Sequence, residues 1–479
     1  MKEKFGYLPQ NERKKILLIC DDIRVHSGVA TVAREIVTNS CQHFNWINVA
    51  GAINHPEQGK KIDLSESIQQ QTQVEDAIVY QYPVNGYGDS NILRQLLKIE
   101  KPDAIMIITD PRYFEWLFQI ENEIRKQCPI VYLNIWDDLP SPLYNKTYYE
   151  SCDALLAISK QTKLINELVL GEKAKNKIIE YVPHGLDPNI YYPIEEGDEI
   201  KLLHQFKTQM GLDNKRFVLF FNSRNIRRKQ IPDTMLAWKY FLDTLPKEEA
   251  HQCTFVLHTE IISEHGTDLE VVRKILFNEY PNAIKFSTNK LSPQQLNYLY
   301  NIADAQILLS SNEGWGLTLT EAMLAGTPII ANVTGGMQDQ MGFLDDNDKW
   351  YTPTPEIPSN HTQTYKMCGD WAFPVFPSNR SLQGSPKTPY IWDDRCNPED
   401  ASLIVGTLYE MSKEERKQKG KKGREWVMSE QVGFTSEHMA NRVIKAIDQL
   451  FNTWNPREQF ELIDIDEVEE PQLNHNLIY

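Results

Sequence analysis

The segment from Ser310 to Gly336, SSNEGWGLTLTEAMLAGTPIIANVTGG, carries the residue types best suited to chemistry. Glu313 precedes a glycine-rich turn, and Glu321 lies on the helix that the pattern predicts after that turn. We therefore expect both carboxylates to face one cleft. Carboxylates accept hydrogen bonds from hydroxyl groups, so this pair suits a sugar on one side and a ribose on the other.

The same turn is suited to phosphate. Glycines let a backbone approach a ligand closely. The amides of Gly316, Leu317 and Thr318 would lie at a helix N-terminus, which favours an anion. The alternative is a buried strand, turn and helix with two solvated glutamates and no ligand.

Basic residues follow another predicted strand, in the sequence FFNSRNIRRKQ. Arg224 and Lys229 lie on a loop that leaves the carboxyl end of the apolar run 217–221, where parallel sheets bind ligands. Fixed cations at that edge can neutralise a diphosphate leaving group. For Arg227 and Arg228 we expect only a basic surface loop.

Short apolar runs alternate with helical patterns along most of the chain, which predicts parallel, doubly wound sheets. The chain has 479 residues, enough for two large domains. We expect an N-terminal domain at 1–190, a linker at 191–215 and a C-terminal domain at 216–435. An aromatic-rich segment at about 345–394 lacks periodicity and is expected as an irregular insertion, and 436–479 as a closing helix and acidic tail that pack back toward the N-terminal domain.

Composition limits the partners and the location. Fifty Lys and Arg stand against 66 Asp and Glu, for a net charge of −16, so the overall field does not steer the protein to nucleic acid. Seven scattered cysteines suit reduced thiols. Without an apolar stretch near the length of a membrane span, we expect a cytoplasmic protein.

No metal is expected to be required. Asp346-x-Asp348 and Asp464-x-Asp466 match a bare D-x-D, but such pairs arise by chance in a chain this acidic, and neither follows a strand in the right place. The basic pair already supplies the charge that a divalent ion would otherwise bring.

Taken in order, the motifs resemble family 4 glycosyltransferases of the GT-B architecture. The matching elements are Ser27-Gly28-Val29-Ala30, the PHG-x-D at 183–187, Arg224 with Lys229, the E-x7-E from Glu313 to Glu321, Ala325-Gly326-Thr327-Pro328, and Gly335-Gly336. The resemblance implies an α/β fold of two Rossmann-like domains facing across a cleft. It also implies a retaining hexosyl- or pentosyltransferase that uses a UDP- or GDP-type sugar donor and needs no cofactor.

The resemblance also implies roles for individual residues. Glu313 would contact the donor sugar hydroxyls and Glu321 the ribose, while Arg224 and Lys229 would stabilise the β-phosphate. Gly28 would let the N-terminal loop close over the diphosphate. Asn289, in the loop at 286–291, would lie near the nucleobase.

The chain departs from the family at one point. A His often follows the fourth strand of the N-terminal domain, but here the run 104–108 leads into Thr109-Asp110-Pro111. Asp110 is either a substitute that accepts a proton or stabilises positive charge, or a turn-forming Asp before Pro. Trp136 and Asp137 are candidates for acceptor recognition.

Two further points concern the acceptor. His26, beside the donor loop, is a weaker candidate because a lone His is more often structural. A general likeness to phage-encoded members raises a hydroxymethylated DNA base as an acceptor, and the location would then be the host cytoplasm. The alternatives are a polysaccharide or lipid-linked acceptor, or a nucleotide-sugar epimerase or hydrolase on the same fold.

Overall fold

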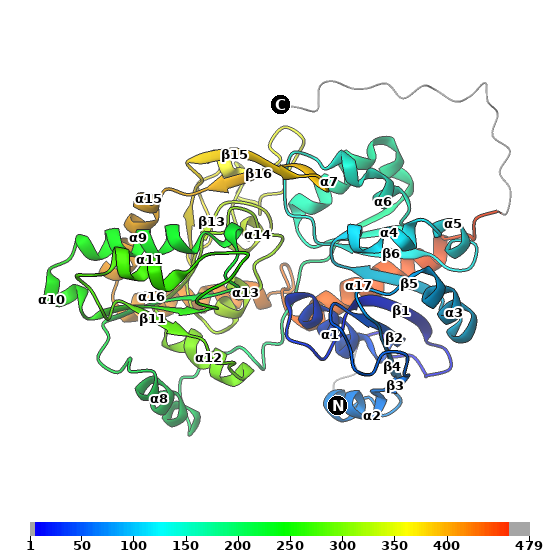
Figure 1. The fold of residues 1–479 in the computed structure, drawn as a ribbon, viewed down its shortest axis with the longest axis horizontal. Helices are drawn as coiled ribbons and strands as arrows, with labels where there is room; N and C mark the ends of the chain where they lie inside the picture. Colours follow the sequence, from blue (N-terminus) through cyan, green and yellow to red (C-terminus); the bar gives the residue numbers. More distant parts are fainter. Residues whose placement is uncertain (1–4, 459–479) are drawn as a thin grey trace.

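The computed structural model describes residues 5–458, which form two α/β domains side by side (Figure 1). Most of the acidic segment expected at the end of the chain, together with Asp464-x-Asp466, lies outside the described residues.

The N-terminal domain contains an eight-stranded sheet in the order β3-β4-β2-β1-β5-β6-β7-β8. All neighbours pair in parallel except β3 and β4. The strands are β1 (Lys14–Asp21), β2 (Phe44–Gly51), β3 (Ile62–Asp63), β4 (Val79–Pro83), β5 (Ala104–Ile108), β6 (Ile130–Asn134), β7 (Ala154–Ala157) and β8 (Ile178–Tyr181).

Strand β1 shows why these segments form a central sheet. Its apolar run is buried on both faces: Ile16 and Leu18 lie in one hydrophobic cluster, and Leu17 and Ile19 lie in the other. Side chains alternate along a strand, so an unbroken apolar run suits a parallel strand that helices cover on both sides.

The helices that cover this sheet are short or of medium length. They are α1 (Gly28–Ser40), α2 (Ser65–Thr72), α3 (Ser90–Glu100), α4 (Glu115–Phe118), α5 (Glu121–Ile124), α6 (Lys146–Glu150) and α7 (Lys160–Leu170), with 3-10 turns η1 (Pro111–Phe114), η2 (Leu143–Asn145) and η3 (Gly171–Asn176). Residues 111–124 form three short elements, η1, α4 and α5, rather than one continuous helix.

The C-terminal domain contains a parallel six-stranded sheet in the order β11-β10-β9-β12-β13-β14. The strands are β9 (Phe217–Asn222), β10 (Cys253–His258), β11 (Ile284–Ser287), β12 (Ala305–Leu308), β13 (Ile329–Asn332) and β14 (Ala372–Val375). Because β9 and β12 are neighbours, the loops that follow them meet at the same edge of the sheet.

The remaining helices belong to this domain, the linker or the closing segment. They are α8 (Glu199–Gln209), α9 (Ile231–Asp243), α10 (Lys247–Ala250), α11 (Leu269–Leu276), α12 (Pro293–Ile302), α13 (Leu317–Leu324), α14 (Met337–Met341), α15 (Pro398–Glu410), α16 (Lys413–Met428) and α17 (Ser436–Thr453), with 3-10 turns η4 (Arg227–Lys229) and η5 (Asn360–Thr362). Helix α17 crosses back and packs on α1.

The segment at 345–394 is more regular than its composition indicates. It contributes β14 to the edge of the C-terminal sheet and then forms an antiparallel hairpin, β15 (Asn379–Ser385) and β16 (Thr388–Arg395). A two-stranded ribbon without a sheet to cover leaves little hydrophobic periodicity in its sequence, which explains why the pattern does not predict it.

Candidate functional site

Glu313 lies at the carboxyl edge of the C-terminal sheet, on the loop after β12. Only 8% of the residue is exposed. Its Oε2 atom accepts hydrogen bonds from Nζ of Lys229, from Nη1 of Arg228 at 2.9 Å and from Oγ of Ser310 at 3.1 Å. A buried carboxylate with two cationic partners is paired rather than solvated, whereas the alternative for this turn expected two solvated glutamates.

The prediction that Arg228 belongs to a surface loop is wrong. Its Nη1 atom donates to the Asn312 carbonyl at 2.8 Å as well as to Glu313, and its own carbonyl accepts from the Ser311 amide at 2.8 Å. The turn η4 after β9 buries Lys229 and directs the guanidinium of Arg228 to Glu313, while 36% of the Arg228 side chain stays exposed. Adjacent basic residues in a sequence do not reveal which of them a turn directs inward, so no local signal distinguishes Arg228 from Arg227.

Burial and the neighbouring charges shift the pKa values of Glu313 and Lys229. Burial by itself raises the pKa of Glu313, but the positive charges of Arg228 and Lys229 outweigh it and lower the pKa to about 2. Burial lowers the pKa of Lys229 to about 8, although Glu313 opposes the shift. At neutral pH the site therefore holds two cations and one carboxylate in contact.

Arg224 is placed differently from its predicted partner Lys229. Its side chain is exposed, and it lies close enough that its charge contributes to lowering the pKa of Lys229. The structure thus brings Lys229 and Glu313 together directly and leaves Arg224 at the outer side of the same loop.

The N-terminus of α13 has the geometry expected for the glycine-rich turn. Gly316 adopts a φ of +88°, a left-handed conformation that favours glycine, immediately before the helix begins at Leu317. Oγ1 of Thr318 is buried and has no hydrogen-bond partner in the structure. A buried hydroxyl without a partner at a helix N-terminus suits an anionic ligand.

Glu321 points from α13 to a second polar group. Its Oε2 atom accepts from Tyr300 Oη at 2.5 Å and from Asn222 Nδ2 at 3.4 Å. Burial raises the pKa of Glu321, and these hydrogen bonds oppose the shift. Tyr300 and Asn222 are not predicted from the sequence as site residues, although Asn222 ends the strand β9 that leads into the basic loop.

The N-terminal domain presents Asp137 to this site. A Cβ atom on Gly314 would lie 2.9 Å from the carbonyl of Ile135 and 3.8 Å from Cβ of Asp137, so the two loops are in contact. Burial raises the pKa of Asp137, while Arg228 lowers it and Glu313 raises it. The structure therefore brings Asp137 within electrostatic reach of the Glu313 group.

Trp136 and Asp110 are occupied by local contacts. Trp136 is 8% exposed and donates from Nε1 to the Asp138 carbonyl at 2.7 Å. Asp110 accepts from the Arg112 amide at 2.9 Å at the start of η1 and also pairs with the Arg112 guanidinium. This geometry favours the turn-forming interpretation of Asp110.

The predicted donor loops of the two domains also face each other. A Cβ atom on Gly28 would lie 3.5 Å from Cδ1 of Leu317, at the start of α13. His26 is exposed. Its pKa is lowered, mainly by partial desolvation and to a lesser extent by the positive charges of Lys290 and Arg34. Asn289, beside Lys290, is exposed as well.

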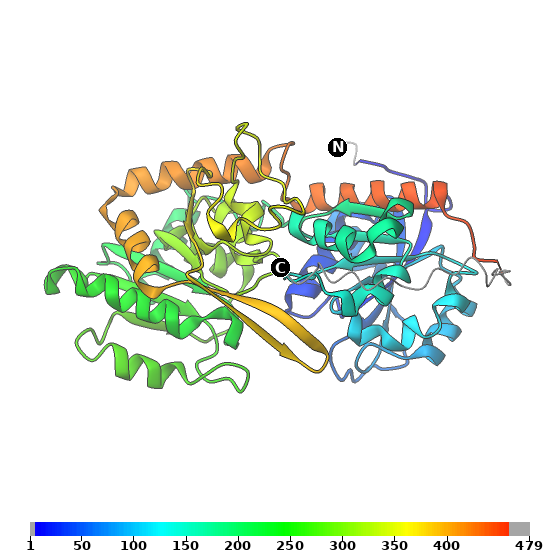
Figure 2. The same ribbon diagram turned by 90° about the horizontal axis from the view of Figure 1, so that it is seen from above.

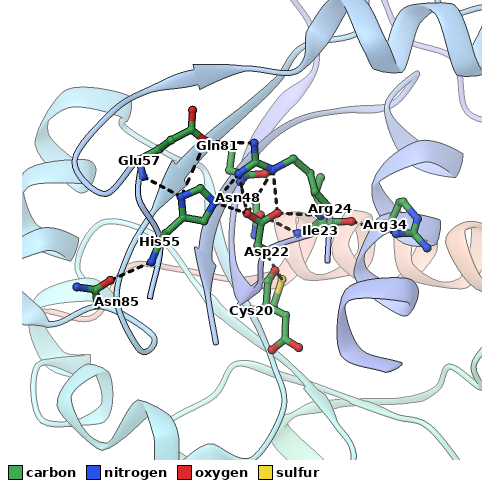
Figure 3. Close-up of polar contacts among 11 residues, drawn as sticks. Cys20, Asp22, Ile23, Arg24, Arg34, Asn48, His55, Glu57, Gln81 and Asn85 are labelled. Atoms are coloured by element: carbon green, nitrogen blue, oxygen red, sulfur yellow. Dashed lines mark hydrogen bonds and ion pairs between the residues drawn. The ribbon is translucent and has the colours of Figure 1, made fainter. Parts of the chain in front are cut away.

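A buried polar cluster holds the loop that leads to Gly28 (Figure 3). Asp22 accepts from Arg24 Nη2 at 2.8 Å and from Gln81 Nε2 at 2.8 Å, and His55 Nε2 lies 3.1 Å from its carboxylate. Since Gln81 lies on β4 and His55 follows β2, these contacts attach the loop that precedes α1 to two neighbouring parts of the N-terminal sheet.

Neither a metal-ligating cluster nor a membrane-spanning helix occurs among the described residues. Within residues 5–458, no group of three or more His, Cys, Asp and Glu side chains is arranged to hold a metal ion. Over the same range, no helix has both the length and the apolar character that crossing a membrane requires.

Similarity to known proteins includes part of the C-terminal domain. Residues 204–348 match the family model described as "Glycosyl transferases group 1". The mannosylfructose-phosphate synthase of Agrobacterium fabrum is 24% identical over 197 residues, which cover 40% of this chain and 39% of that protein. The alpha-galactosylglucosyldiacylglycerol synthase of Streptococcus pneumoniae is 24% identical over 252 residues, which cover 50% of this chain and 63% of that protein. The chain thus spans less than two thirds of the length of these relatives.

Solved structures share the fold over nearly the whole chain. Anabaena HepE, solved in complex with UDP and glucose, has a TM-score of 0.62 at 14% identity and covers 91% of this chain and 100% of its own. The sucrose-phosphate synthase of Thermosynechococcus elongatus has a TM-score of 0.62 at 15% identity and covers 92% of this chain and 100% of its own. The predicted resemblance and fold class are confirmed: the chain has the GT-B fold, and residues 204–348 match the model of the group 1 glycosyl transferases.

Proposed function

We propose that this protein is a retaining glycosyltransferase that moves a sugar from a nucleoside diphosphate donor to a hydroxyl group of an acceptor. One observation carries the proposal: Arg228, Lys229 and Glu313 form one ion-paired group at the edge of the C-terminal sheet, with Lys229 and Glu313 buried, Arg228 partly exposed and Asp137 of the other domain facing it.

Each part of the site has a role in this proposal. Arg228 and Lys229 bind the diphosphate and stabilise the charge that develops as the leaving group departs, with Arg224 at the outer side. The amides of Gly316, Leu317 and Thr318 bind a phosphate oxygen at the start of α13. These contacts supply positive charge without a metal ion.

The carboxylates hold the hydroxyl groups of the donor. Glu313 keeps its charge through its two cationic partners and accepts from the sugar, and Glu321 accepts from the ribose. The loop at His26 and Gly28 closes on the donor from the N-terminal domain, opposite Asn289 at the nucleobase.

The reaction itself is a substitution at the anomeric carbon. The bond between that carbon and the diphosphate oxygen breaks, and the nucleoside diphosphate leaves with the electron pair. The acceptor oxygen bonds to the same face of the sugar and gives its proton to the departing phosphate. Asp137 and Trp136 lie on the acceptor side, whereas Asp110 is held by Arg112 and is assigned to the loop structure.

Uridine nucleotides are the first donors to test. HepE was solved with UDP and glucose, and an Escherichia coli trehalose-6-phosphate enzyme was solved with UDP-2-fluoro glucose. For the acceptor, the names of the relatives point to a sugar phosphate or a diacylglycerol glycolipid. A hydroxymethylated base in DNA remains the alternative that the sequence raised.

A donor and acceptor screen tests the proposal. The full chain is incubated with UDP-glucose, UDP-galactose or GDP-mannose and with sugar phosphates, diacylglycerol vesicles or hydroxymethylated DNA, and products are weighed by mass spectrometry. We expect one acceptor to gain a single sugar as nucleoside diphosphate is released. Release of free sugar or an epimer with no modified acceptor would instead indicate a hydrolase or epimerase.

A further inference from the structure

The hairpin of β15 and β16 extends from the C-terminal domain to the N-terminal domain, as Figure 2 shows. Its strands pair antiparallel, with Ser381 opposite Asp393 and Leu382 opposite Trp392. The proposed roles above leave this hairpin without a function, although it bridges the two domains that form the site.

The outer part of β16 is attached to the loop that follows β6. Tyr390 Oη donates to the Ser141 carbonyl at 3.1 Å and accepts from the Leu143 amide at 3.2 Å. Tyr144 Oη donates to the Tyr390 carbonyl at 2.9 Å, and the two rings meet edge to face. These contacts fix the end of the hairpin against the N-terminal domain.

Backbone and apolar contacts extend this attachment. The Trp392 amide donates to the Leu139 carbonyl at 2.8 Å. The side chains of Ile391 and Trp392 are partly buried against the hydrophobic cluster beneath that loop. The hairpin is therefore packed against the N-terminal domain as well as hydrogen-bonded to it.

The base of β16 is attached to the loop that carries Glu313. Asp393 Oδ1 accepts from Ser311 Oγ at 3.2 Å and from Asn312 Nδ2 at 3.0 Å. The Asp394 amide donates to the Ser311 carbonyl at 2.9 Å. Since Asn312 directly precedes Glu313, the hairpin supports the backbone beside the proposed sugar-binding carboxylate.

The same asparagine joins the two domains at this point. Asn312 Nδ2 lies 3.3 Å from Asp138 Oδ2, next to Asp137 on the acceptor side. Strand β16 thus lies beside both the loop that would hold the donor sugar and the loop that would face the acceptor.

We propose that the part of β16 at residues 390–392 shields the donor sugar from water and so favours transfer over hydrolysis. This inference rests on the proposed transferase function. In both reactions the anomeric carbon loses its bond to the diphosphate and gains a bond to an oxygen that gives up its proton. The two reactions differ in whether that oxygen belongs to the acceptor or to water, so access of water sets their ratio.

A shortened hairpin separates the contacts at the outer part of β16 from the contacts at its base. Residues 382–392 are replaced by Asn-Gly, which forms a two-residue turn between the paired residues Ser381 and Asp393. The contacts of Asp393 and Asp394 with the Glu313 loop are kept, while those made by Tyr390, Ile391 and Trp392 are removed. Thermal unfolding followed by circular dichroism checks that the variant folds.

The readouts are UDP binding by calorimetry and release of UDP from UDP-glucose without an acceptor, with GDP and GDP-mannose in parallel. We expect the Kd of the shortened variant for UDP to stay within about threefold of the wild-type value. Without an acceptor, the variant should release UDP from UDP-glucose about tenfold faster. An unchanged rate of release, with nucleotide binding intact, would overturn the shielding role. Absence of nucleotide binding in the wild type would overturn the proposed donor site, and this inference with it.

A point variant tests the same idea if the shortened hairpin does not fold. Tyr390→Phe removes the hydroxyl that contacts Ser141 and Leu143, so release of UDP without an acceptor should rise about threefold. Lys387→Ala, at the exposed turn of the hairpin, is the matched control and should leave the rate unchanged. Equal rates in both variants would contradict the inference.

Discussion

Nη1 of Arg228 lies 2.9 Å from Oε2 of Glu313 and 2.8 Å from the carbonyl of Asn312, so one guanidinium joins the loops that follow β9 and β12. The neighbouring strands bring together two segments that are far apart in the sequence. This contact favours the charged form of the carboxylate and holds a cation at the proposed diphosphate site.

Arg228→Ala should reduce turnover of the donor by about 10²-fold, because it removes a cation from the developing negative charge of the leaving group. Release of nucleoside diphosphate under initial-rate conditions measures the effect. Arg227→Ala, on the exposed side of the same turn, is the control and should change the rate less than twofold. Equal losses in both variants would contradict the assignment of Arg228.

The rate should also depend on pH through Lys229. Its pKa is lowered to about 8, so the ammonium is present below that pH and is lost above it. We expect kcat/KM for the donor to fall as the pH rises through 8, since this parameter reports the free enzyme. In Lys229→Arg the fall should move to higher pH, because arginine stays protonated. A profile that is the same in both proteins would exclude Lys229 as its origin.

Gly335→Ala should unfold the site locally. A Cβ atom there would lie 2.1 Å from the backbone oxygen of Glu313, and the φ of +50° already disfavours alanine. We expect a lower Tm and a loss of donor turnover of at least about 10²-fold.

Gly59→Ala is the control for backbone strain. Gly59 has a φ of +82° and nothing within 4 Å of a Cβ atom, so it carries the strain without the collision. This variant should lose only about 1 kcal/mol of stability and keep its turnover. If Gly335→Ala behaves in the same way, the collision with Glu313 has no effect on the site.

Excess chelator should leave the rate of transfer unchanged, because Arg228 and Lys229 supply the positive charge at the diphosphate. The measurement is the initial rate with EDTA, with Mg²⁺ or Mn²⁺ added back as the control. A loss of activity that either ion restores would show that a metal is required.

The parts of this molecule that local patterns encode were predictable. Unbroken apolar runs such as β1, and the turn at Gly316 before α13, depend on neighbouring residues in the sequence. Two α/β domains with a ligand-binding edge follow from those patterns.

The contacts that depend on tertiary structure were not predictable. The inward direction of Arg228 depends on the turn η4 and on the loop after β12, and the position of β16 depends on loops from both domains. Asp110 is the opposite example. Of its two interpretations, the one that depends on neighbouring residues, a turn-forming Asp before Pro111, agrees with the structure.

The turnover of Glu313→Gln tests the central assignment most directly. The substitution keeps the size of the side chain but removes the charge that Arg228 and Lys229 surround. Release of UDP from UDP-glucose, with the acceptor found in the screen, should fall by at least about 10²-fold while the Tm shows that the variant is folded. A folded variant that releases UDP at the wild-type rate would show that the chemistry occurs elsewhere.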